Sequence, residues 1–328
     1  MRADRLPTMR TAMDDGDPKQ GLPDSVMGSL RVSTKLFDHE IAIDEADLLD
    51  RLRSQYADMA AGPLSLFAAG TDNRMYRLGT EYLVRVPRTP SASVQLRKEL
   101  HWLPRIASAV PSKVPVVHGA VTMDGSPLPV AALYRWIDGT PGSAALEALD
   151  TPENARRLAD WIAALRAIPA ADGPRPGAHN FNRGEPLHKR DKRIAGLIRR
   201  HASRFDETLA RRIWSEALES VCDEADVRWH HGDLQPSNVL LQGGRMDAVI
   251  DFGGLGVGDP SVDLLPCWTV FGPRARAVMF EALGSDGAAW RRGRGWALAT
   301  ALKAYDYYRG KSPGMVRQSL RTLDAVLS

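Results

Sequence analysis

Two short segments contain side chains that could bind a metal ion and accept a proton. The first, HHGDLQPSN (230–238), carries Asp233 and Asn238, and Asp251 follows thirteen positions after Asn238. Between them lie two short, mainly apolar runs joined by a Gly-Gly pair, a dipeptide that favours a hairpin turn. The predicted hairpin brings Asn238 and Asp251 together at its open end. Two oxygen ligands placed in this way suit Mg²⁺, which keeps several waters and binds phosphates.

Asp233 lies close to this site without being required to bind the metal. A carboxylate in that position can accept the proton of an attacking hydroxyl group, as phosphoryl transfer requires. Asp, Asn and Gly also form turns and helix caps, which is the alternative interpretation. The combined spacing and the hairpin favour the catalytic one.

The composition sets limits on the class of protein. The 328 residues are 44% hydrophobic and 25% charged, enough for a core in each of two lobes. A net charge of +3 and the lack of a long apolar stretch predict no nucleic-acid partner and no membrane partner. Two cysteines without a CxxC pair fit a reducing compartment, and the N-terminus has no apolar signal-like region. We therefore expect a cytoplasmic protein.

The order of predicted elements indicates an α+β fold with two lobes. Residues 1–28 form a polar tail that we expect to be disordered, 29–137 a strand-rich N-lobe, and 138–328 a mainly helical C-lobe. The turn-rich stretch 138–142 suits a hinge between them, and a cleft between lobes is a common ligand site. Strands are predicted at 64–69, 75–78, 82–86, 114–117 and 130–137, and helices at 46–60, 93–109, 151–168, 188–203, 206–224, 273–284, 288–309 and 314–327.

The two segments resemble motifs of the aminoglycoside/macrolide phosphotransferase family, which has a protein-kinase-like fold. HGDLQPSNVLL (231–241) is similar to the family's catalytic loop, and IDFGGLGVGDPSVDL (250–264) to its metal-binding segment; the resemblance covers about residues 60–310. It implies a kinase that uses ATP, or GTP, with Asp233 as catalytic base. It also implies that Asn238 and Asp251 hold Mg²⁺ and that Asp263 braces the catalytic loop.

The resemblance extends to the N-lobe, with one departure. Gly70 and Thr71 occupy the place of the loop that covers the nucleotide phosphates. Arg85 stands where kinases carry a phosphate-contacting Lys, and an Arg differs from a Lys in shape and reach. Glu99 would be the ion-pair partner of Arg85, although a solvated charge on a helix face is the alternative. The hinge motif implies adenine hydrogen bonds to the backbone of Arg135 and Ile137.

The acceptor is the least determined part of the prediction. Only seven residues separate Asp251 from Asp259, too few for the peptide-docking platform of a protein kinase, so a small-molecule alcohol is expected. The family suggests an antibiotic such as an aminoglycoside, a macrolide or a peptide, but residues 264–328 contain ten basic and four acidic side chains, which disfavours a polycation. Alternatives are a kinase of choline, homoserine or a sugar amine, and a silent nucleotide-binding protein, for which Arg85 is the support.

Overall fold

The computed structural model describes residues 40, 41, 43–70, 72–122, 128–284 and 287–328. These residues belong to one of the two units of the chain, His39–Ser328. The predicted tail, 1–28, lies outside the described residues. No helix in the described part of the chain is both long and apolar enough to span a bilayer.

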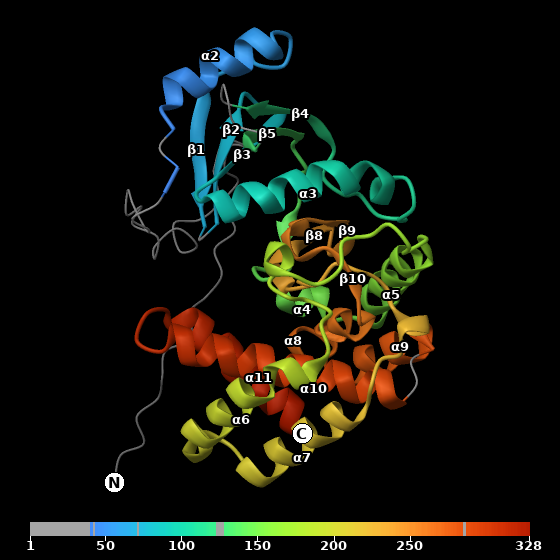
Figure 1. The fold of residues 1–328 in the computed structure, drawn as a ribbon. Helices are drawn as coiled ribbons and strands as arrows, with labels where there is room; N and C mark the ends of the chain where they lie inside the picture. Colours follow the sequence, from blue (N-terminus) through green and yellow to red (C-terminus); the bar gives the residue numbers. More distant parts are fainter. Residues whose placement is uncertain (1–39, 42, 71, 123–127, 285–286) are drawn as a thin grey trace, which may run out of the picture. The chain divides into compact units, whose positions relative to one another are not determined.

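The N-terminal part of this unit is an antiparallel sheet with a helix against each face (Figure 1). Leu48 and Leu52 of one helix pack on side chains from one face of the sheet, whereas Leu96 and Leu103 of the other helix join the large core of the C-terminal part. The strands, in the order β1-β2-β3-β5-β4, are β1 (Leu64–Ala69), β2 (Asn73–Leu78), β3 (Tyr82–Pro87), β4 (Val117–Thr122) and β5 (Pro129–Arg135), and the helices are α2 (Glu45–Gln55) and α3 (Pro90–Ala107).

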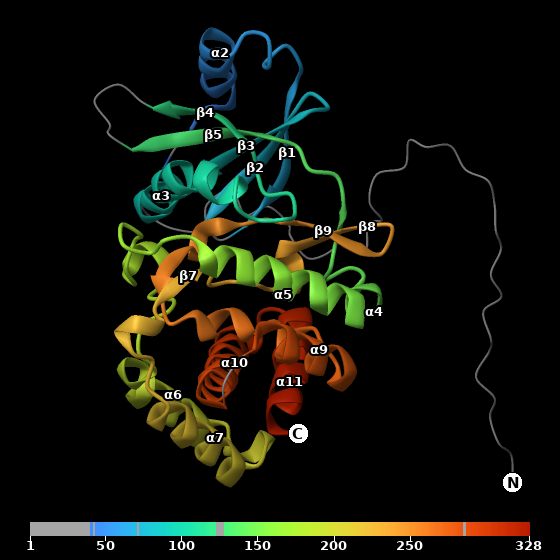
Figure 2. The same ribbon diagram turned by 90° about the vertical axis from the view of Figure 1, so that its right-hand side faces the viewer.

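The C-terminal part is mainly helical and carries two small antiparallel sheets (Figure 2). Its strands are β6 (Thr140–Pro141), β7 (Arg228–His230), β8 (Val239–Gln242), β9 (Arg245–Val249) and β10 (Gly256–Gly258), with β6-β8-β9 in one sheet and β10-β7 in the other. The α-helices are α4 (Leu146–Leu149), α5 (Pro152–Ala167), α6 (Asp191–Arg200), α7 (Glu207–Glu219), α8 (Pro266–Thr269), α9 (Pro273–Leu283), α10 (Gly287–Tyr308) and α11 (Pro313–Leu327). The 3₁₀ helices are η1 (Ala178–Asn180), η2 (Leu187–Arg190), η3 (Ala202–Arg204), η4 (Glu224–Asp226), η5 (Pro236–Asn238), η6 (Phe252–Gly254) and η7 (Pro260–Leu264).

Side-chain caps explain where several helices begin. Thr89, Thr151, Asp206 and Ser312 each accept a hydrogen bond from a backbone N–H in the first turn of α3, α5, α7 and α11. Such caps satisfy donors that have no partner within the helix. In α3, α5 and α11 a proline also follows the cap, where its missing N–H costs nothing. The predicted helices are therefore present, with ends that differ by a few residues.

The hairpin predicted between the two motifs is present as β8 and β9. Its turn residues Gly243 and Gly244 have φ of +58° and +80°, a backbone conformation that glycine adopts without strain. Val239 pairs with Val249, and the N–H of Ile250 donates to the carbonyl of Asn238 at 2.9 Å. The small sheets and the large helical part confirm the predicted α+β class.

One predicted strand is wrong. The segment 114–117 is not a strand, because β4 begins only at Val117. Pro115 has no N–H to donate to a sheet. The preceding Lys113 exchanges backbone hydrogen bonds with Asp247 and Val249 of the β8–β9 hairpin instead. This stretch therefore ties the N-terminal part of the unit to the hairpin that carries the motif residues.

Candidate active site

A buried carboxylate, Asp263, holds the loop before Asp233 in place. Asp263 accepts hydrogen bonds from the backbone N–H groups of His231 at 2.7 Å and of Gly232 at 2.8 Å. Gly232 has φ of +79°, and a Cβ atom there would lie 2.4 Å from the carbonyl oxygen of Gly254. Only glycine therefore fits, and the loop is fixed immediately before Asp233. Asp263 thus contacts the loop as the resemblance implied.

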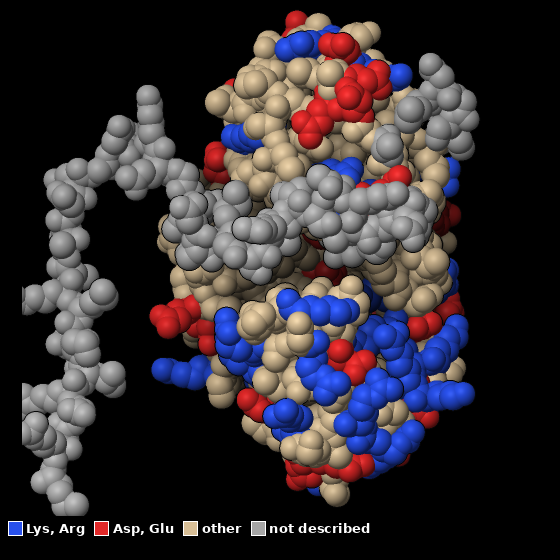
Figure 3. Space-filling view, turned by 90° about the vertical axis from the view of Figure 1, so that its left-hand side faces the viewer, with Lys and Arg blue, Asp and Glu red and all other residues tan. Residues whose placement is uncertain are grey.

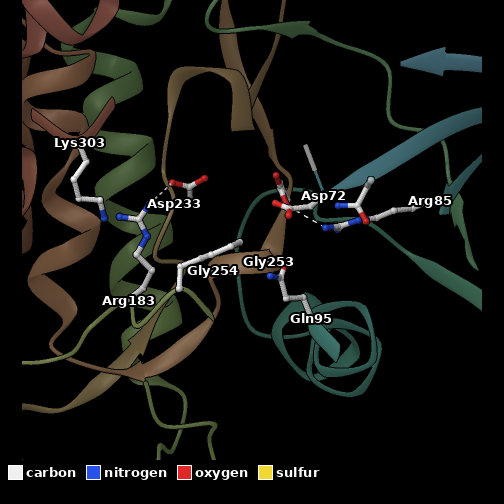
Figure 4. A pocket seen from close by; sticks show the side chains of 11 residues that line it. Asp72, Arg85, Gln95, Arg183, Asp233, Gly253, Gly254 and Lys303 are labelled. Atoms are coloured by element: carbon white, nitrogen blue, oxygen red, sulfur yellow. Dashed lines mark hydrogen bonds and ion pairs between the residues drawn. The ribbon is translucent and has the colours of Figure 1, made fainter. Parts of the chain in front are cut away.

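Asp233 faces the cavity and is held on both sides. Its Oδ1 accepts from Arg183 Nη2 at 3.1 Å, and Asn238 Nδ2 donates to its carbonyl at 2.8 Å (Figure 4). One third of the side chain remains exposed. Burial raises the pKa of the Asp233 carboxyl group, and the positive charge of Arg183 opposes that effect. The fixed carboxylate can thus receive a hydrogen bond from a hydroxyl group that enters the cavity.

Asn238 and Asp251 lie at the open end of the hairpin, as predicted. The backbone hydrogen bond between Asn238 and Ile250 sets the two candidate ligands on adjacent strand ends. Asp251 has φ of +64°, unusual for a residue with a side chain, and 47% of that side chain is exposed. Among the described residues no group of three or more His, Cys, Asp or Glu could hold a metal ion. A Mg²⁺ ion held by two protein oxygens, phosphates and water needs no such group.

The electrostatics of this end of the cavity fit a cation. Asp72, immediately before β2, lines the same cavity as Asp251. Burial raises the pKa of Asp72, the negative charge of Asp251 raises it further, and Arg85 lowers it. Two carboxylates that repel each other would be stabilised by a divalent cation between the protein and a nucleotide. The residues present therefore fit Mg²⁺.

A buried ion pair connects the sheet to helix α3. Arg85 Nη1 lies 2.6 Å from Glu99 Oε2, and Arg85 Nη2 lies 3.4 Å from Asp251 Oδ1. Glu99 is 1% exposed and also accepts from the Tyr134 hydroxyl at 2.9 Å. Glu99 is therefore not a solvated surface charge. Protein kinases use the corresponding Lys–Glu pair to orient the nucleotide phosphates, and Arg85 makes the same connection here.

The other described residues predicted to contact the nucleotide do not line the cavity that contains Arg85. Gly70 begins the β1–β2 turn, and its carbonyl accepts from Arg88 at 3.2 Å, whereas Thr71 lies outside the described residues. The N–H of Arg135 donates to Val116, which leaves only its carbonyl for a ligand. The N–H of Ile137 has no acceptor among the described residues. The hinge residues are not among those that line the cavity described next.

Three of the predicted site residues line one cavity of about 300 Å³. It brings Arg85, Asp233 and Asp251 together with residues that the sequence did not single out (Figure 4). Arg183 precedes Asp233 by fifty positions, and Lys303 lies on α10, so no local motif pointed to either. The lining residues are Asp72, Asn73, Arg85, Gln95, Phe181, Arg183, Asp233, Asp251, Gly253, Gly254 and Lys303.

Lys98 joins helix α3 to the segment that follows Asp251. Its Nζ donates to the carbonyls of Gly253 and Leu255, both at 2.8 Å, and of His179 at 3.1 Å. Burial lowers the pKa of Lys98 to about 7. A neutral amine has only two N–H donors, so the three carbonyls are all satisfied only by the charged ammonium. Lys98 therefore fixes the backbone that follows Asp251.

The profile of the phosphotransferase enzyme family matches residues 63–296, more than half of the chain. The chain belongs to the phosphotransferase enzyme family. This confirms the family resemblance of the two motifs. Aminoglycoside 3'-phosphotransferases from Escherichia coli and Salmonella typhimurium are each 26% identical over 159 residues, or 44% of this chain and 56% of the relative. The chain thus spans about half the length of the curated relatives that it matches.

Solved structures of other phosphotransferases have the same fold. The GDP complex of aminoglycoside 2'-phosphotransferase-IIIa matches 87% of this chain and 99% of its own, with a TM-score of 0.65 and 17% identity. A macrolide 2'-phosphotransferase from Brachybacterium faecium matches 85% and 98%, with a TM-score of 0.59 and 21% identity. At these identities the likeness shows the fold alone, and it confirms the predicted kinase-like architecture.

Proposed function

We propose that this phosphotransferase moves the γ-phosphoryl group of ATP or GTP to a hydroxyl group of a small molecule. The observation that carries the proposal is the convergence of Asp233, Asp251 and Arg85 on one cavity. The side-chain amide of Asn238 donates a hydrogen bond to the backbone carbonyl of Asp233. Solved relatives are complexes with GDP, ATP or ADP, which supports a nucleotide as co-substrate.

Each residue has a role that follows from its contacts. Asp233 would orient the acceptor hydroxyl and accept its proton. Arg85, held by Glu99, would contact the nucleotide phosphates bidentately. Asn238 and Asp251 would hold Mg²⁺, which when bound neutralises charge on the transferred phosphoryl group. Most of the rate would come from positioning, which explains why Asp263 and Lys98 fix the loops so firmly.

A small-molecule acceptor fits the segment after Asp251. The chain passes directly through η6 into β10, which pairs with β7 in the catalytic segment. This course leaves no long activation loop on which a peptide could dock. Relatives whose names specify aminoglycoside or macrolide substrates make an antibiotic hydroxyl one acceptor class to test.

The test is phosphoryl transfer from labelled Mg-ATP and Mg-GTP to a panel of antibiotics, sugars, hydroxy acids and amino alcohols. Asp233→Asn should lower turnover by about 10²-fold or more while nucleotide binding stays within about twofold of wild type. Asp324→Asn, an exposed aspartate on α11, is the matched control and should be active. Wild-type turnover rates in Asp233→Asn, or no nucleotide binding by the wild type, would contradict the proposal.

A further inference from the structure

The side of the cavity that would receive the acceptor carries two cations. In Figure 4, Asp233 lies between Lys303 and Arg183 on one side and Asp72 and Arg85 on the other. If Arg85 marks the nucleotide side, an in-line transfer to a hydroxyl at Asp233 places the body of the acceptor toward Lys303 and Arg183.

A strained turn points Arg183 at Asp233. Phe181 and Asn182, just before Arg183, have φ of +57° and +54°, a conformation that side chains disfavour. Arg190 stabilises this turn because its Nη2 donates to both of their carbonyls, at 3.1 and 2.7 Å. Gly184 follows with φ of +75°, and a Cβ atom there would lie 2.3 Å from the His230 ring. The local structure thus holds Arg183 in the cavity wall.

Lys303 has no counter-charge of its own. Its ammonium makes no hydrogen bond or ion pair with any other residue that the structure describes. Burial, together with the positive charges of Arg183, Arg190 and Arg193, lowers the pKa of Lys303 to about 7, and the negative charge of Glu185 opposes this effect. Glu185 is itself paired with Arg190 at 3.1 Å. Cations crowded in this way would be stabilised by an anionic ligand.

The helical part of the unit also carries many basic side chains, and its helix α6 packs against α10, which carries Lys303. On the face shown in Figure 3, Lys and Arg side chains gather over the helical part of the unit. Helix α6 alone contributes Lys192, Arg193, Arg199 and Arg200. A basic surface next to the cavity raises the local concentration of anions and lowers that of polycations.

Resting on the proposed function, we infer that the acceptor is an anion: a hydroxyl compound with a carboxylate, phosphate or sulfate group that binds between Lys303 and Arg183. A polycationic aminoglycoside would add positive charge where Lys303 already lacks a partner. The substrate class named by several relatives is therefore the one that this cavity disfavours, although the transfer chemistry at Asp233 would be the same.

The test measures binding of inorganic sulfate by calorimetry, at constant ionic strength, to the free enzyme and to its complex with Mg²⁺ and a non-hydrolysable ATP analogue. We expect sulfate to bind the analogue complex, and Lys303→Met to weaken that binding at least about tenfold. Lys303→Arg should retain it. Lys113→Met, which removes an exposed lysine that is neither on α6 nor among the residues that line the cavity, is the matched control and should bind sulfate like wild type.

The two sulfate measurements distinguish an anion on the acceptor from the phosphoryl group of the nucleotide. Sulfate that binds the free enzyme but not the analogue complex would assign the cations to the transferred phosphoryl group, and the inference would be wrong. Absence of sulfate binding in both states, or equal binding by Lys303→Met, would overturn it as well. So would kanamycin binding to the analogue complex that is as tight as sulfate binding. A failure of the proposed function would appear separately, as loss of analogue binding by the wild type.

Discussion

Replacing Asp263 by asparagine should show how much of the activity depends on the position of the catalytic loop. The side chain is fully buried, and its two oxygens accept from the N–H groups of His231 and Gly232. An amide keeps one oxygen but places an N–H₂ group against the second backbone donor. The loss of one charge-assisted hydrogen bond lowers the free energy of unfolding by about 1.5–3 kcal/mol. The buried N–H that is left without an acceptor lowers it by about a further 1–3 kcal/mol.

Part of this cost is offset because burial opposes the charged carboxylate, as the raised pKa of Asp263 indicates. We therefore expect Asp263→Asn to lower the free energy of unfolding by about 2–4 kcal/mol, or the melting temperature by roughly 4–16 °C. Displacement of Asp233 by about an ångström should lower kcat by about 10²-fold. Thermal unfolding and initial rates of phosphoryl transfer measure the two effects, with Asp324→Asn as the control. A variant with a lower melting temperature but the wild-type rate of phosphoryl transfer would refute the positioning role of Asp263.

Other perturbations test separate parts of the unit. Glu99→Gln removes the closer carboxylate partner of the buried Arg85 and leaves only the 3.4 Å contact with Asp251. It should therefore lower the free energy of unfolding by about 3 kcal/mol and weaken Mg-nucleotide binding; unchanged binding would argue against the phosphate role of Arg85. Lys98→Met removes the donor to three carbonyls and should reduce both thermal stability and nucleotide affinity, which a melting curve and a nucleotide titration would show. His230 is buried, and neither of its ring nitrogens is hydrogen-bonded to a described residue. Burial lowers the pKa of His230 to about 3. Between about pH 6.5 and 3, the unfolded chain therefore binds a proton at this residue that the folded protein does not bind. Stability should fall as pH drops through that range, by up to about 1.4 kcal/mol per pH unit, and His230→Leu should flatten the decline in acid-denaturation curves; an equally steep decline in the variant would exclude His230 as the cause.

The sequence was sufficient for those parts of the site that depend on local spacing. Asn238 and Asp251 are joined by one short hairpin, so two glycines and two apolar runs predict their proximity. The Arg85–Glu99 pair joins a strand to the helix that follows it, and the family resemblance was enough to identify it. The predicted strand at 114–117 was wrong in a place where the preceding residue, Lys113, exchanges backbone hydrogen bonds with a hairpin more than a hundred residues later, a contact that a short sequence window does not contain.

Arg183 and Lys303 could not have been predicted in the same way, and the reason bears on substrate choice. Each reaches the cavity from a separate element, Arg183 alone contacts Asp233, and neither belongs to a spacing pattern that the transfer chemistry requires. The motif residues are constrained by the nucleotide, the metal ion and the hydroxyl group, which are common to this kind of reaction. Residues on the far side of Asp233 are constrained only by the acceptor, so their charges can differ between enzymes with the same motifs. If the proposed function holds, the acceptor should therefore be sought from the charges of Arg183 and Lys303 rather than from the two motifs.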